Sequence, residues 1–171
     1  MDLENIITAD SSPYPEIRVQ GENKLMAERL TYTFGGSAGE FDSTAQYVYQ
    51  SIMLKNSHPP QSELLLRIAK TEMHHLYMIG ELITKLGGQP IYGWKNAGKT
   101  HYWNGEQLNY SPDPATMYLH DLAGEQKAYS TYVSLARQSG DRYVFALLTR
   151  IALDEMIHAS LFKTLLSDLR K

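Results

Sequence analysis

Residues 154–158 read Asp-Glu-Met-Ile-His, close to the carboxyl-terminal end of the chain. Around this stretch, side chains on one helix face recur at intervals of three or four positions: Leu148, Ile151, Glu155, His158, Phe162 and Leu165. This spacing is typical of a buried helix face. Because glutamate is rarely buried without a partner, the carboxylate and the imidazole in this face need one.

A second stretch repeats the pattern upstream. Its face consists of Leu65, Ile68, Glu72, His75, Ile79, Leu82 and Leu86. A single Glu-x-x-His motif in an apolar face would be weak evidence of a function. Two such motifs, each inside a buried face, indicate a common cause, and the simplest cause is a pair of metal ions.

The composition limits the classes of protein to consider. A chain of 171 residues with 43% hydrophobic residues can bury one good core. The net charge of -3 gives no electrostatic footprint for nucleic acid. No apolar run approaches the roughly 18 residues of a membrane span, and the first residues lack the features of a signal peptide, so we expect a cytoplasmic protein. Without cysteine, only carboxylates, imidazoles and water can hold a metal.

The chain divides into an arm and one helical domain. Residues 1–22 contain prolines and a glycine with little periodicity and are expected to form an extended arm. Residues 23–171 are expected to hold four helices, from about 23 to 55, from 59 to 86, from 114 to 139 and from 141 nearly to 171. Within the first helix, the glycine-rich segment 35–39 predicts either close helix packing or a local bend.

The second and third helices are joined by a long segment, residues 89–111, which is rich in aromatic residues and glycines. Asn104-Gly105 within it is typical of a tight β-hairpin turn. The other connections are short. Four helices with one long crossover predict an all-α bundle in up-down-down-up order, which is the connectivity of ferritin-like folds.

Each of the other two helices should supply one inward carboxylate. The third presents a face made of Tyr118, Leu122, Glu125, Tyr129, Tyr132 and Ala136, and the first presents Glu40. Each half of the chain then has a Glu, a Tyr seven positions later and Glu-x-x-His on the next helix: Glu40, Tyr47, Glu72 and His75, then Glu125, Tyr132, Glu155 and His158. This internal repeat predicts a site on a pseudo-two-fold axis.

Charge balance supports a metal site. Four buried carboxylates without partners would each destabilise the fold by several kcal/mol. Two divalent cations would balance them if both histidines stay neutral, and in metal-free protein the same groups should take up protons or loosen the bundle. The alternative, a buried salt-bridge network, needs lysine or arginine on these faces, and none stands beside the six residues.

Over residues 24–168 the sequence resembles the ferritin-like di-metal carboxylate proteins. The resemblance rests on Tyr-Val-Tyr-Gln at 47–50 and on Arg-Ile-Ala-Leu-Asp-Glu-Met-Ile-His at 150–158. Both segments are similar to helices of rubrerythrin- and bacterioferritin-related proteins, and manganese catalases share the Glu and Glu-x-x-His skeleton. The resemblance implies two iron or two manganese ions per chain.

The same resemblance implies which residues hold the metal. Each ion would take one Glu and one His, namely Glu40 with His75 and Glu125 with His158. In the bacterioferritin arrangement, both Glu72 and Glu155 would bridge the two ions. In the catalase arrangement only Glu72 bridges, and Glu155 stands off as an acid or base. The sequence leaves both arrangements open.

The sequence also departs from these families. It has no cysteine-rich segment, so it cannot be a complete rubrerythrin with its own electron-transfer centre. Position 128 is alanine, where rubrerythrins carry an extra glutamate. The aromatic crossover is foreign to cage-forming bacterioferritins, which argues against a hollow storage shell. With the arm, it resembles a spore-coat and catalase-like branch of the superfamily.

Four further residues have competing interpretations. Tyr47 and Tyr132 are predicted to hydrogen-bond the ligand carboxylates or to quench radicals, unless backbone groups satisfy them. Asp154 could orient a histidine ring or serve as a solvated or capping residue. Met73 follows Glu72, as the haem-ligating methionine does in bacterioferritins, but a methionine on a helix is more often a packing residue. We therefore expect no haem.

These features predict a di-metal oxidoreductase that acts on O2, peroxide or Fe(II), with Glu155, Tyr47 and Tyr132 as catalytic candidates. With iron, we expect ferroxidase or peroxidase turnover; with manganese, we expect peroxide disproportionation. A different class keeps the fold without catalysis, as an iron-binding or coat assembly protein. In each case we expect no nucleic-acid or membrane partner, and a homo-oligomer such as a dimer.

Overall fold

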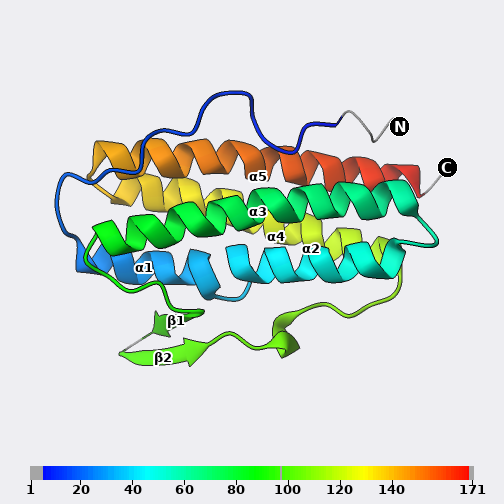
Figure 1. The fold of residues 1–171 in the computed structure, drawn as a ribbon, viewed down its shortest axis with the longest axis horizontal. Helices are drawn as coiled ribbons and strands as arrows, with labels where there is room; N and C mark the ends of the chain where they lie inside the picture. Colours follow the sequence, from blue (N-terminus) through cyan, green and yellow to red (C-terminus); the bar gives the residue numbers. More distant parts are fainter. Residues whose placement is uncertain (1–5, 97, 170–171) are drawn as a thin grey trace.

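Two antiparallel helix pairs make up most of the molecule (Figure 1). In the computed structural model, residues 6–96 and 98–169 are described. The elements in chain order are α1 (Lys24–Gly35), α2 (Glu40–Leu54), α3 (Pro59–Lys85), β1 (Gly93–Asn96), β2 (Lys99–Tyr102), the 3-10 helix η1 (Gly105–Gln107), α4 (Pro114–Gln138) and α5 (Arg142–Asp168). The closest packing is of α2 on α3 and of α4 on α5.

The helices form a four-helix bundle because α1 and α2 lie end to end in one position of it (Figure 1). From there α3 runs back, α4 runs parallel to α3 after the long crossover, and α5 returns antiparallel to α4. This is the predicted up-down-down-up order, and the ferritin-like bundle is confirmed.

The glycine-rich segment does more than bend the first helix, because α1 ends at Gly35 and α2 begins at Glu40. Between them Ala38 has a φ of 60°, which is incompatible with a continuing right-handed helix. The β1–β2 hairpin packs directly on the end of α1, where a Cβ added to Gly35 would lie 2.4 Å from the backbone nitrogen of Gly93. The end of α1 at Gly35 therefore leaves room for the hairpin of the crossover, and Glu40 becomes the first residue of a new helix.

The predicted hairpin turn at Asn104-Gly105 is wrong. The two strands pair antiparallel, with Trp94 opposite His101, and the turn lies before Lys99, where Gly98 has a φ of +76°. The side chain of Asn104 instead accepts a hydrogen bond from the Glu106 amide at 2.9 Å and begins η1. An asparagine that caps a helical turn has the same sequence signature as one in a hairpin turn.

Apolar side chains fill two regions, one toward each end of the bundle, and buried polar residues lie between them. The stripes predicted around the two Glu-x-x-His motifs are buried throughout. On α4 the prediction is wrong for Tyr129, which is 39% exposed. No helix among the described residues is long and apolar enough to cross a membrane.

The segment before α1 lies along the outside of α3 and α5 (Figure 1). Residues 6–22 contain no helix or strand; the predicted arm also includes residues 1–5, which lie outside the described residues. The carbonyl of Ile6 accepts a hydrogen bond from Arg67 at 3.0 Å, and the amide of Gln20 donates to Asp141 at 2.6 Å. The described part of the arm, residues 6–22, is thus held near both of its ends.

Candidate metal centre

Four helices bring the six predicted ligand residues together at the middle of the bundle. Potential ligand atoms form two groups, each with its atoms within 4.8 Å of one another: Glu40, Glu72, His75 and Glu155 in the first, and Glu72, Glu125, Glu155 and His158 in the second. Glu72 and Glu155 belong to both groups. All six residues are buried, with at most 3% of any of them exposed.

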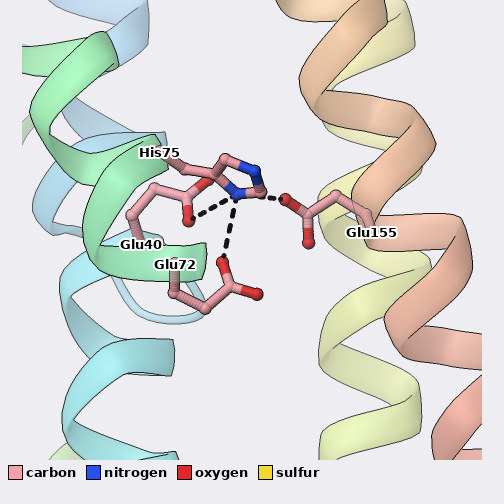
Figure 2. Close-up of side chains that lie close together, drawn as sticks. All are labelled: Glu40, Glu72, His75 and Glu155. Carbon is pink, nitrogen blue, oxygen red and sulfur yellow. Dashed lines mark ion pairs between the residues drawn. The ribbon is translucent and has the colours of Figure 1, made fainter. Parts of the chain in front are cut away.

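The first group surrounds one imidazole nitrogen, as Figure 2 shows. Nδ1 of His75 lies 3.1 Å from Glu155, 3.4 Å from Glu72 and 3.6 Å from Glu40. These carboxylates come from three different helices, so only the assembled bundle creates the group.

The second group has the same construction around the other imidazole. Nδ1 of His158 lies 2.7 Å from Glu72, 3.6 Å from Glu125 and 3.8 Å from Glu155. Together the two groups reproduce the internal repeat of the sequence as two half-sites that share a pair of glutamates.

Several polar atoms of the cluster are buried without a hydrogen-bond partner. They are Oε1 of Glu72, Nδ1 of His75, Oε1 of Glu155 and Nδ1 of His158. Even the 2.7 Å contact between His158 and Glu72 lacks the alignment of a hydrogen bond. Buried polar atoms are normally satisfied, and lone pairs of carboxylate and imidazole that converge in this way fit divalent metal ions. The cluster has the composition of a dinuclear metal site.

The far sides of both imidazole rings are held by hydrogen bonds, which leave Nδ1 facing the cluster. Nε2 of His158 donates to the carbonyl of Thr8 at 2.7 Å, and because a carbonyl can only accept, this nitrogen carries the proton. Nε2 of His75 lies 2.9 Å from the carboxylate of Asp154. The prediction that Asp154 orients a histidine is confirmed, but the ring belongs to the other Glu-x-x-His motif.

The two repeat tyrosines cross between the halves of the molecule. Tyr47 on α2 donates a hydrogen bond to Glu125 on α4, and Tyr132 on α4 donates one to Glu40 on α2. Burial and the adjacent carboxylates raise the pKa of both hydroxyls well above the ordinary value, so they remain donors. The predicted hydrogen bonds to the ligand carboxylates are present, and a role in radical quenching stays a prediction.

Without metal, protons balance the charge of the cluster. Burial, followed by repulsion from Glu72 and Glu155, raises the pKa of Glu40 and of Glu125 well above the usual range. Burial alone would lower the pKa of His75, but the four carboxylates around the ring, with Asp154 first among them, raise it well above the ordinary value. This agrees with the expected proton uptake of metal-free protein.

The sequence analysis missed a buried cation and its partners from the arm. Arg150 is 6% exposed and donates to Asp154 at 2.7 Å, and Tyr14 donates to the same carboxylate at 2.5 Å. The four-residue spacing of Arg150 and Asp154 on one helix could have revealed the first pair. No local pattern could have revealed Tyr14, which is 140 residues from Asp154 in the sequence.

A small cavity of about 10 Å³ reaches the cluster from the side of α2 and α4. Its inner wall includes Glu40, Glu155 and Tyr132, and Ala128 lines it as well. A cavity of this size has room for about one water-sized molecule. Ala128 therefore stands where a longer side chain would reduce this space.

A ferritin-like bundle around paired Glu-x-x-His motifs defines the class of di-metal carboxylate proteins. Comparison with known proteins gives the family: the model of the rubrerythrin family matches residues 36–166. The chain belongs to the rubrerythrin family.

The chain is also similar to individual proteins. A probable manganese catalase from Clostridium acetobutylicum is 24% identical over 173 aligned residues, covering 91% of this chain and 76% of the relative. The crystal structure of the manganese catalase KatB from Anabaena superposes with a TM-score of 0.83 at 24% identity, covering 97% of this chain and 82% of that one. Bacterioferritin from Desulfovibrio desulfuricans, whose structure has a diiron site, gives a TM-score of 0.68 at 21% identity, covering 88% and 85%.

Proposed function

We propose that this protein binds two manganese ions and disproportionates hydrogen peroxide to water and O2. The observation that carries the proposal is the pair of half-sites that share Glu72 and Glu155. The choice of manganese over iron is supported by the similarity to two manganese catalases along nearly the whole chain. The balanced reaction consumes two H2O2 and yields two H2O and one O2, so no external electron donor is needed.

The residues would divide between the two ions by half-site. Glu40 and His75 would hold one ion, Glu125 and His158 the other, with Glu72 and Glu155 available to both. Four carboxylates and two neutral imidazoles balance two divalent cations. A pair of redox-active ions would supply the chemistry of storing and returning the two electrons that peroxide conversion exchanges.

The side chains around the ions would position ligands and move protons. Tyr47 and Tyr132 fix the outer carboxylates by hydrogen bonds from opposite helices. The cavity beside Ala128, which has room for about one water-sized molecule, would mark the side from which a small substrate reaches Glu40 and Glu155. Following the catalase arrangement, we propose that Glu155 takes a proton from one peroxide and returns it as water forms; its carboxylate lies 3.1 Å from His75 and 3.8 Å from His158.

Two measurements test this proposal. Protein from its native host should contain manganese, and manganese-loaded protein should release one O2 for every two H2O2 consumed. Glu155→Gln should lose this release, whereas the matched change on the surface of α3, Glu81→Gln, should not. Iron in the native protein with O2 uptake on addition of Fe(II) would instead establish a ferroxidase, and protein that binds neither ion would overturn both.

We also propose that the chain works as a homo-oligomer. On α3 the large apolar side chains Leu66, Met73 and Tyr77 are 39%, 56% and 69% exposed and share one face. Met73, expected to be a packing residue, thus lies on the surface. Light scattering should give a mass of at least two chains, and Tyr77→Glu should lower it. A monomeric wild-type protein would contradict this expectation.

The cytoplasmic location stays a prediction, and cell fractionation can test it.

A further inference from the structure

The arm before α1 contacts both half-sites on the side of each histidine ring that faces away from the cluster. Residues 8–14 lie against α3 and α5, and the arm supplies the carbonyl of Thr8 that accepts the Nε2 proton of His158 at 2.7 Å. It also reaches the other histidine, because Asp154, the partner of His75, is held by arm residues. One short segment therefore supplies the hydrogen-bond partner of His158 and holds Asp154, the partner of His75.

The attachment of Asp154 to the arm is extensive. The backbone amide of Asp10 donates to one carboxylate oxygen at 2.6 Å, and the hydroxyl of Tyr14 donates to the other at 2.5 Å. With the bond to His75, these contacts fix both oxygens.

A buried arginine fastens the same part of the arm to α5. Arg150 donates to the carbonyls of Asp10 and Ser12, at 2.7 Å each, and to Asp154 at 2.7 Å. Its guanidinium also lies over the ring of Tyr14, 4.1 Å from the ring centre. Arg150 uses several donors in fixed directions, so the arm has one preferred position relative to both histidines.

From these contacts we infer that the arm is a positioning element of the metal centre, and that its docking and metal binding favour each other. Both histidines must present a bare Nδ1 toward the cluster, and the arm fixes this orientation from the opposite side of each ring. By linkage, an arm that favours the ligating orientation is itself held more firmly once metal is bound. This inference rests on the metal centre proposed above and assigns Tyr14 as a positioning residue.

Removal of one hydroxyl tests the inference. Tyr14→Phe should weaken manganese binding, measured by competition with a chelator, roughly 10-fold to 100-fold. The matched control is Tyr49→Phe, which also removes a hydroxyl that donates one hydrogen bond, to the carbonyl of Tyr110 at 3.2 Å, away from the centre. The control should keep wild-type affinity. Equal affinities in both variants, with two ions still bound, would overturn the inference and leave the proposed function intact.

Hydrogen exchange of the wild-type protein gives a second test that does not depend on any variant. Amides of residues 8–14 should exchange more slowly when manganese is bound, because the amide of Asp10 donates to the partner of a ligand. Amides of the β1–β2 hairpin, which has no contact with either histidine ring among the described residues, serve as the internal reference. Arm exchange that does not respond to bound metal would contradict the coupling, whereas a wild-type protein that binds no metal would refute the metal centre itself.

Discussion

Four of the six proposed ligands are held by a second residue on the side away from the cluster. Glu40 and Glu125 accept hydrogen bonds from tyrosines, His75 is held by Asp154, and His158 is held by a backbone carbonyl. Such partners fix the rotamer and the protonation state of a ligand before metal arrives. Only Glu72 and Glu155, which both half-sites share, have a buried oxygen without a partner.

The tyrosines offer a prediction for each half-site. Tyr132→Phe removes the hydrogen bond to Glu40 and should weaken binding at the half-site of His75 by about 1 to 3 kcal/mol, because a buried carboxylate loses its donor. Tyr47→Phe should do the same at the other half-site. Titration with manganese should then separate two binding steps. Tyr129→Phe, which changes an exposed residue of the same helix, should leave one unresolved transition.

Metal binding should release protons. In metal-free protein the pKa values of Glu40, Glu125, His75 and His158 are all raised, so these groups hold protons at a pH where the free side chains would hold fewer. Metal requires the deprotonated ligands, and affinity should fall as the pH is lowered. Calorimetry in two buffers of different ionisation enthalpy measures the protons released. Identical heats in both buffers would show that none are released.

At the scale of elements, hydrogen bonds attach the crossover to α2, the helix that begins with the proposed ligand Glu40. The indole of Trp103 donates to Asp42 in the first turn of α2 at 2.7 Å, two residues from Glu40. Gln46 exchanges two hydrogen bonds with the backbone of Asn109, at 2.9 and 2.7 Å. The crossover therefore holds the helix that carries one ligand, in addition to joining α3 to α4.

A methyl group at the break should disturb this arrangement. Gly35→Ala would place a Cβ 2.4 Å from the backbone of Gly93, and since backbone cannot move aside easily, we expect a loss of about 1 to 3 kcal/mol in the free energy of unfolding. Gly124→Ala, in the middle of α4, where the added carbon would meet nothing within 4 Å beyond its own stretch of helix, should raise stability slightly. Urea denaturation of both variants measures the difference, and equal stabilities would show that the contact is unimportant.

For the whole molecule, a metal centre between two apolar regions should couple metal to global stability. Manganese at 100 times its dissociation constant should stabilise the fold by roughly 2.7 kcal/mol for one site, or about 5 to 10 °C in melting temperature for a chain of this size. A variant with His75→Ala and His158→Ala should melt at a temperature independent of manganese. If wild type and variant respond alike to the metal, the ligand assignment is wrong.

Much of the fold and of the candidate metal centre can be predicted from local patterns in the sequence. The period of a helix alone determines which residues share a face. The two Glu-x-x-His faces, together with Glu40 and its counterpart Glu125, therefore predict the bundle and its six inward-facing side chains. The turn at Asn104 could not be decided in this way, since the same side chain serves a hairpin or a helical turn. Similarly, a glycine-rich segment is compatible with either a bend or a break.

Only the tertiary structure decided which partners meet across the bundle. Asp154 contacts the histidine of the other Glu-x-x-His motif, and Tyr47 and Tyr132 each donate a hydrogen bond to a glutamate of the other half of the chain. Tyr14 donates a hydrogen bond to Asp154 from an arm whose sequence has no periodicity. Contacts between residues 78 to 140 positions apart depend on how whole helices are placed beside each other. The sequence by itself determined which groups must be buried and neutralised, and the packing of helices and arm determined which atoms satisfy them.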